Sequence, residues 1–415
     1  MLNNGRPSQW ARASVAAAAL ALSACLSPQP DSFLAVAHKN RPAVDVFYVT
    51  NRAPVTHENG AHSYGAGRSH SLAFGSVTVA GHEAAEAVVA EPQEIGRFPA
   101  TPYDIEPAPG GMRRASETIA AHEQSLAQLQ AELQRRVAAS RRKEVVVFIH
   151  GYNNSFDDAA KSTGQICNDL GPEDFTCVAL TWPAGGSKGI LFGYNVDRES
   201  GEFAVIDVRK SIRMIAGTPG LQKIHFLAHS RGTDVLTSAL QHLNIESYVA
   251  QGSLWSRLRI ANIILAAPDI DIDVALSRLL GVPSDPDMPF GAAPLRSKVF
   301  KSGALHFTIY SSLSDRALRM STFLFGSALR LGMLDAHSEP DEMRMLPHVA
   351  GAADFIGVQG GGGLIGHSYF LSDPAVRSDL VALIRDSKKP GEEGRPMQEV
   401  SKPFWFLPDR PSGAQ

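Results

Sequence analysis

The sequence has little of what would indicate a metal site, a nucleic-acid partner or a membrane-spanning segment. It contains only three cysteines in 415 residues and neither a C-x-x-C nor an H-E-x-x-H pattern, so these metal-site signatures are absent. Its 39 basic residues do not exceed its 42 acidic ones, so there is no positive excess of the kind that binds nucleic acid. No apolar run after the amino terminus is long enough to cross a bilayer, and the glycine-rich segments lack the strand-Gly-Lys-Ser/Thr context of a phosphate loop. We therefore expect a globular protein with no metal, no cofactor and no nucleic-acid partner.

The amino terminus has the pattern of an export signal. Arg6 and Arg12 precede an uncharged run of alanine and leucine at residues 13–24, which suits a signal-peptide core and is too short to span a bilayer. The run ends in Leu-Ser-Ala-Cys, which resembles the bacterial lipoprotein box, in which the cysteine, here Cys25, is lipidated and becomes the first mature residue. We expect residues 1–24 to be a lipoprotein signal peptide, and acyl chains to anchor the protein to the bacterial cell envelope, facing the periplasm. A plain secretory signal cut nearby is the alternative, and it also exports the chain.

Export bears on the two remaining cysteines, Cys167 and Cys177, which lie ten residues apart. In an exported protein they could close a disulfide loop worth ~2–3 kcal/mol in the chain-entropy model. Two buried free thiols fit the sequence equally well.

Residues 223–243 carry the pattern around which the chain is organised. A short apolar strand pattern at residues 224–227 gives way to apolar residues at helical spacing, and Ser230 lies at the junction. Ala228 and Gly232 are small, as the residues two before and two after such a serine must be, because strand and helix pass close to each other there. The pattern A-x-S-x-G therefore predicts a nucleophile elbow, which exposes the serine oxygen at the carboxyl edge of a parallel sheet. The other interpretation of these five residues is an ordinary serine N-cap after a strand.

Strand and helix patterns alternate through the second half of the chain, which is typical of an α/β protein with a mostly parallel central sheet and helices on both faces. We expect strands at residues 44–50, 72–80, 87–90, 145–149, 175–182, 224–227, 259–267, 306–311 and 354–358. We expect helices at residues 116–143, 155–168, 202–216, 235–243, 316–331 and 374–385, and connections at residues 51–68, 99–111 and 183–193.

These patterns predict one main domain. We place it at residues 44–386 and connect it to the lipidated terminus by a tether at residues 25–43. The charged and proline-rich segment 387–415 is expected to be disordered apart from the apolar patch at residues 404–407.

A serine hydroxyl needs a base that takes its proton, and a histidine base needs a carboxylate that holds its tautomer. In the α/β-hydrolase arrangement the acid and then the histidine follow the serine along the chain, each after a later strand. His367 lies between the last predicted strand and the terminal helix, so we predict that it is the base. His306, His337 and His348 lie at the start of a strand or before the last one, and we interpret them as structural or surface residues.

Two aspartates compete for the role of the acid. Asp315 follows the second strand after the elbow, which is the usual place, and Asp269 follows the first. Each also has a structural interpretation, because Asp269 or Asp271 could cap the helix that begins there and Asp315 could cap the helix at residues 316–331. We predict Asp315 and keep Asp269 as the alternative.

Two backbone N–H groups are predicted to receive the oxyanion. One belongs to Arg231, directly after the nucleophile, and the other to Tyr152, which follows His150-Gly151 at the end of the strand at residues 145–149. The glycine lets the backbone turn so that an N–H can face the carboxyl edge of the sheet.

Taken together, these motifs resemble those of the bacterial esterase/lipase-like α/β hydrolases, a family of unknown function. The segments that carry the resemblance are VTNR at 49–52, FIHGYNNSFDDAA at 148–160, TWPAGGS at 181–187, LAHSRGTDVL at 227–236, LAAPDID at 265–271, YSSLSDRAL at 310–318 and GHSYF at 366–370. The resemblance spans roughly residues 44–386 and implies the α/β-hydrolase fold and a serine hydrolase, with the nucleophile at Ser230 and the base at His367. It implies no particular substrate.

The sequence therefore predicts a membrane-tethered serine hydrolase that cleaves carboxylic esters, lipids among the candidate substrates, through an acyl-enzyme. The alternative is a catalytically inactive hydrolase fold that acts as an envelope lipoprotein in binding or assembly. Two features depart from the family pattern. Ala228 replaces the first elbow glycine, and a methionine- and acid-rich insert at residues 334–349 could be either a lid or a surface loop.

Overall fold

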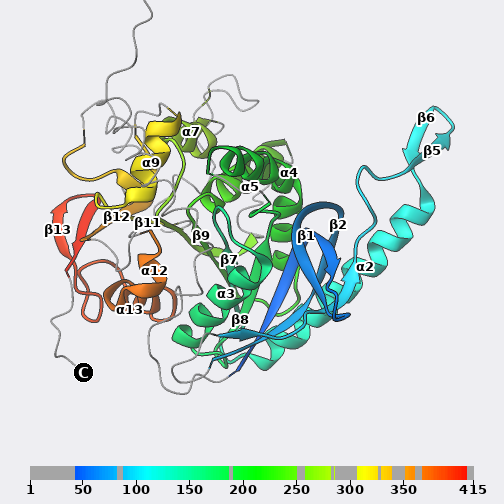
Figure 1. The fold of residues 1–415 in the computed structure, drawn as a ribbon, viewed down its shortest axis with the longest axis horizontal. Helices are drawn as coiled ribbons and strands as arrows, with labels where there is room; N and C mark the ends of the chain where they lie inside the picture. Colours follow the sequence, from blue (N-terminus) through cyan, green and yellow to red (C-terminus); the bar gives the residue numbers. More distant parts are fainter. Residues whose placement is uncertain are drawn as a thin grey trace, which may run out of the picture.

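The structure, a computed structural model, describes residues 43–81, 87–186, 190–249, 258–281, 285, 306–325, 329–338, 351–359 and 367–408. In this part of the chain, twelve strands form a single sheet (Figure 1). Across the sheet the strands are β13 (Gln398–Ser401), β14 (Phe404–Leu407), β12 (Ala353–Val358), β11 (His306–Ser311), β10 (Ile260–Ala266), β9 (Lys223–His229), β7 (Glu144–Ile149), β8 (Phe175–Thr181), β1 (Val44–Thr56), β2 (His62–Ala80) and β3 (Val88–Val89), with β4 (Gln93–Arg97) paired to β2.

The strands from β1 to β14 across the middle of the sheet are parallel, and β2 and β13 pair antiparallel at the two sides. From β7 the chain passes to β8 on one side and then to β9 on the other, so the strand order reverses at β7. In open parallel sheets, ligands bind outside the carboxyl ends of the strands beside such a reversal. The turns that follow β7 and β9 are therefore where a site is expected.

Helices cover both faces of the sheet, as predicted. They are α2 (Ser116–Ala139), α3 (Phe156–Leu170), α4 (Ile190–Ala216), α5 (Gly232–Val249), α7 (Ile272–Leu276), α9 (Arg316–Phe325), α12 (Tyr369–Ser372) and α13 (Pro374–Ile384), with a π turn at Ser277–Gly281 and a 3-10 turn at Leu331–Met333. Side chains of α2, α4, α5 and α7 pack in one apolar core and those of α3, α12 and α13 in the other. Alternate residues of β7 enter the two cores, Val145 and Val147 the first and Val146 and Phe148 the second, which is why this strand is apolar throughout.

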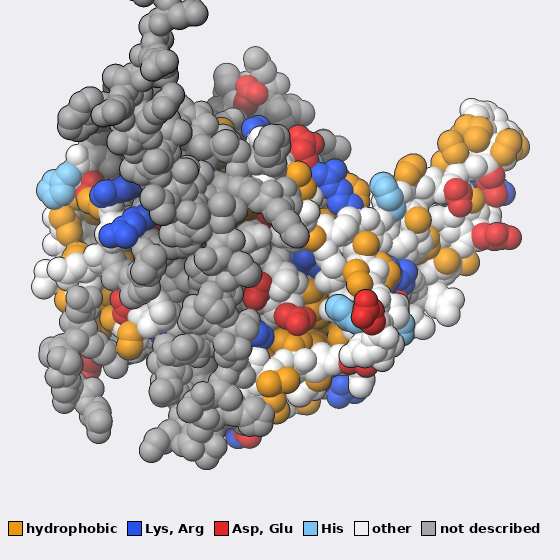
Figure 2. Space-filling view, viewed as in Figure 1, with side chains coloured by type: hydrophobic (Ala, Val, Ile, Leu, Met, Phe, Trp, Pro, Cys, Tyr) orange, Lys and Arg blue, Asp and Glu red, His pale blue; other side chains and the backbone are white. Residues whose placement is uncertain are grey.

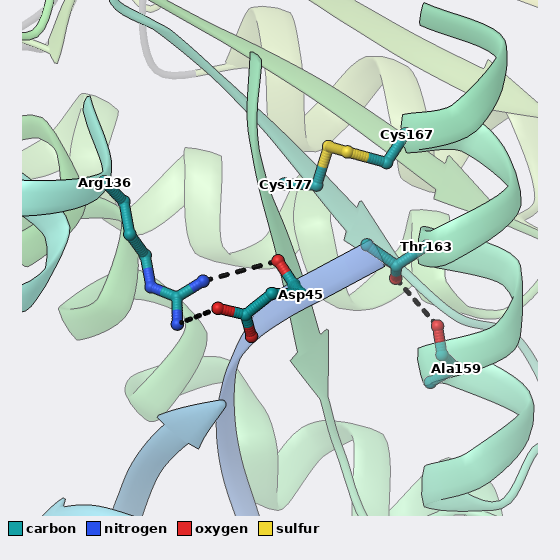
Figure 3. Close-up of a disulfide and its surroundings, with 6 residues drawn as sticks. All are labelled: Asp45, Arg136, Ala159, Thr163, Cys167 and Cys177. Atoms are coloured by element: carbon teal, nitrogen blue, oxygen red, sulfur yellow. Dashed lines mark hydrogen bonds and ion pairs between the residues drawn. A yellow bond between two sulfur atoms is a disulfide. The ribbon is translucent and has the colours of Figure 1, made fainter. Parts of the chain in front are cut away.

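A disulfide joins Cys167 on α3 to Cys177 on β8, with the two Cα atoms 6.0 Å apart (Figure 3). Both cysteines lie in the core on the α3 face. Of the two interpretations of these cysteines, the structure contains the disulfide and not two free thiols. The bond ties α3 covalently to the strand beneath it. Arg136 of α2 forms an ion pair of 2.9 Å with Asp45 of β1, which fastens a helix of the opposite face to the same sheet.

An arm formed by the start of α2 and the hairpin of β5 (Ile105–Ala108) and β6 (Gly111–Arg114) extends away from the body (Figure 1). Figure 2 shows apolar side chains gathered at its tip, where Ile105 and Met112 are 61% and 60% exposed. The sequence predicted only a proline-rich connection at residues 99–111. A hairpin forms there because Gly110 and Gly111, with φ of 89° and 149°, supply the turn.

The predicted loop at residues 51–68 is wrong, because β1 continues to Thr56 and β2 begins at His62. Pro54 pairs with Tyr64, and the hairpin closes through a turn in which the N–H of Gly60 donates to the carbonyl oxygen of His57 at 2.9 Å. Most side chains in this part of the hairpin are exposed. The segment is rich in polar and small residues, and the apolar alternation that would have indicated strands is missing.

The boundaries of two helices also differ from the prediction. α4 begins at Ile190, within the predicted loop 183–193, and not at residue 202. Its first part buries the polar residues Asp197 and Ser200, so the apolar periodicity is broken where the helix packs. α9 ends at Phe325, before the predicted end at residue 331.

Disorder was predicted for the tail from residue 387 apart from the apolar patch at residues 404–407, and this is wrong for residues 387–403. β13 and β14 form a hairpin there, and β14 pairs with β12. Arg395 is fully buried and forms an ion pair of 2.8 Å with Asp379 of α13, which anchors the segment that precedes the hairpin. A charged residue in this role gives no hydrophobic signal in the sequence.

No helix in the described part of the chain is long and apolar enough to cross a membrane. The predicted signal peptide at residues 1–24 and all but the last residue of the predicted tether lie outside the described residues.

Candidate active site

Ser230 lies on a tight turn between β9 and α5. Its φ is 51°, in the left-handed region that non-glycine residues seldom occupy and that is typical of a strained elbow. A Cβ on Gly232 would lie 2.3 Å from the carbonyl oxygen of His150, so only glycine fits where the start of the helix passes the end of β7. Ala228 is fully buried. Gly232 is therefore required by contact, and Ala228 lies buried on the other side of Ser230.

Ser230, His367 and Asp315 form a continuous hydrogen-bonded line. The Ser230 hydroxyl lies 2.7 Å from Nε2 of His367, and Nδ1 of His367 lies 2.7 Å from Oδ2 of Asp315. With an ionised aspartate, Nδ1 carries the proton and donates it, which leaves Nε2 free to accept from the hydroxyl. The three residues come from three different connections, after β9, after β11 and before α12.

Asp315 serves two partners at once. Its Oδ1 accepts a hydrogen bond of 3.1 Å from the backbone N–H of Leu318 in the first turn of α9, while Oδ2 accepts from His367. The side chain of Asp315 therefore caps α9 and contacts His367 at the same time. Because the carboxylate is fully buried and held by the helix, its position is fixed.

The charges around His367 favour its protonated form. Burial alone would lower its pKa, but the charge and hydrogen bond of Asp315, with a contribution from the charge of Asp269, outweigh burial and raise the pKa above the ordinary value of 6.5. An imidazolium that forms when His367 takes a proton is therefore stabilised where it stands.

Asp269 lies close to the same histidine but is bound to other groups. It accepts hydrogen bonds from the hydroxyls of Tyr194 at 2.6 Å and Ser321 at 2.7 Å, and it lies 3.4 Å from Nε of Arg330. Its backbone N–H donates to the carbonyl oxygen of Ser230 at 3.3 Å. Asp269 thus supports the elbow and adds negative charge, and the carboxylate in contact with the histidine is that of Asp315.

Asp271 is the residue that caps the helix after β10. Its side chain accepts from the backbone N–H groups of Asp273 and Val274 in α7. Of the two candidates for this cap, the structure places Asp271 there.

The turn after β7 lies against Ser230. A Cβ on Gly151 would lie 2.7 Å from the Cβ of Ser230, so the backbone that leads to Tyr152 passes directly over the elbow. On the other side, Arg231 immediately precedes α5, whose first N–H groups have no acceptor within the helix. Tyr152 and Arg231, both named from the sequence, are therefore the residues directly after the one that contacts Ser230 and directly after Ser230 itself. Residues 150–154 are called the oxyanion loop below.

His229 is a residue of this site that the sequence analysis did not single out. Its Nε2 donates to the carbonyl oxygen of His367 at 3.2 Å, and its ring centroid lies 4.6 Å from that of Phe370. Burial, with the charge of His367, holds its pKa well below 6.5, so it is neutral at physiological pH. It supports the backbone at His367. Its place directly before the elbow serine was the only signal in the sequence.

His306 and His337, two of the other histidines considered in the sequence, do not lie at this site. Nε2 of His306 pairs with Asp354 at 2.6 Å, and His337 is exposed. His348 lies outside the described residues, as do Cys25 and most of the insert at residues 334–349. In the part of the chain that the structure describes, no three His, Cys, Asp or Glu residues are grouped so that they could hold a metal ion.

Comparison with protein families gives one match. A family model described as "Alpha/beta hydrolase of unknown function (DUF900)" matches residues 125–386, more than half of the chain. A search of curated proteins found no match.

Comparison with solved structures gives several similar chains of low sequence identity. Aspergillus fumigatus lipase B has 11% identity and a TM-score of 0.30, with 60% of this chain and 53% of the lipase covered. The esterase of Pyrobaculum calidifontis has 11% identity and a TM-score of 0.29, with 64% and 93% covered. Carboxylesterase CesB from Bacillus subtilis has 11% identity and a TM-score of 0.25, with 64% and 98% covered. The chain thus spans about half the length of the lipase.

Proposed function

The chain belongs to the family of alpha/beta hydrolases of unknown function. We propose that it is a membrane-tethered serine hydrolase that cleaves carboxylic esters through an acyl-enzyme. The observation that carries the proposal is the line of two 2.7 Å contacts that joins Ser230, His367 and Asp315. This is the arrangement that turns a serine hydroxyl into a nucleophile.

In the first half of the proposed reaction, Ser230 Oγ attacks the ester carbonyl carbon and its proton passes to Nε2 of His367. Asp315 stabilises the resulting imidazolium, and the amides of Tyr152 and Arg231 donate to the oxyanion. The bond from carbon to the alcohol oxygen then breaks, and the alcohol leaves with the proton from His367. The acyl group remains on Ser230.

In the second half, water attacks the acyl carbon and gives its proton to His367. The new oxyanion occupies the same amides, the bond to Ser230 Oγ breaks, and the serine regains a proton from the imidazolium. The carboxylic acid is released and the enzyme returns to its starting state. The raised pKa of His367 supports both halves, because it favours the imidazolium that each requires.

Membrane tethering is proposed from the signal at the amino terminus, where Leu-Ser-Ala-Cys ends in Cys25. Palmitate labelling in a bacterial host should follow Cys25 and be lost in Cys25→Ser. Undiminished labelling of that variant would remove the anchor from the proposal and leave the hydrolase in place.

Hydrolysis of p-nitrophenyl esters of increasing acyl length tests the proposed reaction. We expect turnover by the wild-type chain and none above background with Ser230→Ala, which keeps the fold because only the Oγ atom is removed. Equal rates for the two proteins, or no turnover of any ester, would favour the inactive envelope lipoprotein over the enzyme.

A further inference from the structure

The oxyanion loop is held in place by residues that lie far from it in the sequence. One is Arg52 on β1, within the VTNR motif, for which the sequence analysis gave no role and which lies outside the region matched by the family model. The other is Asp197 in the first part of α4. Both side chains are almost completely buried.

Arg52 binds the loop at both of its ends. Its Nη2 donates to the carbonyl oxygen of Asn154 at 2.6 Å and lies 3.2 Å from Nε2 of His150. Its Nη1 donates to the carbonyl oxygens of Ala184 at 3.0 Å and Gly65 at 3.2 Å. Burial lowers its pKa to about 10, so the guanidinium stays charged at neutral pH. The two terminal nitrogens of a guanidinium can bind these separated groups together, which the single nitrogen of a lysine cannot match.

His150 passes this constraint on to the glycine that touches the nucleophile. Its Nδ1 donates to the carbonyl oxygen of Gly151 at 2.9 Å, and its Nε2 accepts from the backbone N–H of Trp182 at 3.1 Å. Burial and the charge of Arg52 lower its pKa to about 3, so the ring is neutral and keeps one nitrogen as an acceptor. The indole of Trp182 stacks on the ring and donates to the His150 carbonyl oxygen at 2.9 Å.

Asp197 fixes the middle of the loop. Its Oδ2 accepts from the backbone N–H of Asn153 at 2.8 Å and its Oδ1 from that of Gly185 at 2.9 Å. Asn153 needs such support because its φ is 56°. The residues on both sides of Tyr152 are thus anchored, Gly151 through His150 and Asn153 through Asp197.

We propose that Arg52 and Asp197 are positioning residues, which set the amide of Tyr152 at the distance from Ser230 that an oxyanion requires. The inference rests on the proposed function, since it concerns how one of its donors is placed. Neither residue touches the substrate; each acts through the backbone of the oxyanion loop.

A matched control lies ten residues further along the same helix. Asp207 is also a buried aspartate of α4 that faces β1, but it accepts a hydrogen bond from the side chain of Asn51 at 2.9 Å. Its carboxylate is thus held by a side chain of β1 and not by the backbone of the oxyanion loop. Asp197→Asn places an NH₂ group against backbone donors of two loops, whereas Asp207→Asn removes a comparable buried charge elsewhere.

The experiment compares the two variants, and Arg52→Lys, with the wild type in p-nitrophenyl butyrate hydrolysis and in inhibition by an aryl trifluoromethyl ketone. The ketone adds Ser230 Oγ to form a hemiketal whose oxyanion occupies the same amides. For Asp197→Asn and Arg52→Lys we expect kcat to fall on the order of 10- to 100-fold with KM changed less than about threefold. The inhibition constant of the ketone should weaken by the same factor as kcat, and the acid limb of the pH profile should not move, because His367 is untouched.

For Asp207→Asn we expect less than about a threefold change in kcat, in KM and in the inhibition constant of the ketone, even if the variant unfolds at a lower temperature. Equal losses for Asp197→Asn and Asp207→Asn, or a loss confined to KM, would overturn the positioning role and leave the hydrolase intact. A wild-type protein that neither turns over the ester nor binds the ketone would overturn the proposed function and this inference with it. If Arg52→Lys does not fold, the two aspartate variants still decide the matter.

Discussion

The sheet carries a histidine paired with a buried carboxylate at each end of its parallel strands, the carboxyl edge and the amino edge. At the carboxyl ends of the strands, Nδ1 of His367 lies 2.7 Å from Asp315. At the amino ends, Nε2 of His225 on β9 lies 3.0 Å from Glu144 on β7. Both carboxylates are buried, so the two pairs are similar in chemistry and in contact distance.

The third partner and the surrounding charge distinguish the pairs. The second nitrogen of His367 faces the Ser230 hydroxyl, whereas that of His225 accepts from the side-chain amide of Asn262 at 2.8 Å. Burial lowers the pKa of His225, and Glu144 does not outweigh burial together with the nearby cations. At His367 the carboxylates do outweigh burial. A histidine–carboxylate pair therefore does not by itself indicate a catalytic site. A candidate site also needs a hydroxyl in contact with the histidine and backbone donors beside that hydroxyl.

The largest expected loss of ester turnover comes from breaking the hydrogen-bonded line of Ser230, His367 and Asp315. Ser230→Ala and His367→Ala should each lower ester turnover by on the order of 10⁴ or more, because the serine is a strong nucleophile only while the histidine takes its proton. The double variant should be little worse than either single one, as measured by kcat. Independent, multiplying losses would show that the two residues do not act together.

The next effect separates the two acidic candidates at the carboxyl edge. Asp315→Asn should cost on the order of 10³–10⁴ in kcat, since the amide cannot hold the imidazole tautomer or stabilise its charge. Asp269→Asn should cost less than about tenfold, because its hydrogen bonds go to Tyr194 and Ser321. Thermal unfolding of both variants controls for loss of fold. If Asp269→Asn is the more damaging in kcat, the acid has been assigned to the wrong strand.

The pH dependence should report only the carboxyl-edge histidine. The base works when it is neutral, so kcat/KM should rise with pH through the pKa of His367, at a midpoint above 6.5 because that pKa is raised. Removing the charge in Asp315→Asn should move this limb to lower pH in the residual activity. A midpoint below 6.5 in the wild type would mean that burial prevails at His367, as it does at His225.

The smallest effect on turnover should come from the amino-edge pair. Glu144→Gln should change kcat less than about twofold while lowering the free energy of unfolding by about 1–3 kcal/mol, because a buried charge-assisted hydrogen bond is weakened. Urea unfolding measures the stability and ester hydrolysis the rate. A large loss of kcat with a fully folded variant would erase the distinction between the two edges.

The same comparison explains what the sequence could and could not predict. Apolar runs such as β7 and the elbow at Ser230 were predictable because burial and close contact restrict residue type. The order of motifs along the chain was enough to nominate His367 and Asp315, whose side chains the structure brings together.

What could not be predicted is carried by buried polar residues. Arg52, Asp197 and Arg395 each stabilise a loop or hairpin through contacts more than fifteen residues away in sequence. When helices and strands are predicted from the spacing of apolar residues, a polar residue is taken to be exposed. The start of α4 was therefore predicted as a loop and the tail as disordered. His225 and Glu144 show a second limit of the sequence. They form a histidine–carboxylate pair like that at His367, and only the structure shows that the third partner of His225 is Asn262 and not a serine.

The measurement that tests the central claim most directly is the site of reaction with a fluorophosphonate. After treatment and proteolysis, peptide mass analysis should find a single phosphonyl adduct on Ser230, formed at the wild-type rate in Glu144→Gln and far more slowly in His367→Ala. An adduct on another residue, or none on Ser230 in a folded protein, would contradict the claim that this serine is an activated nucleophile.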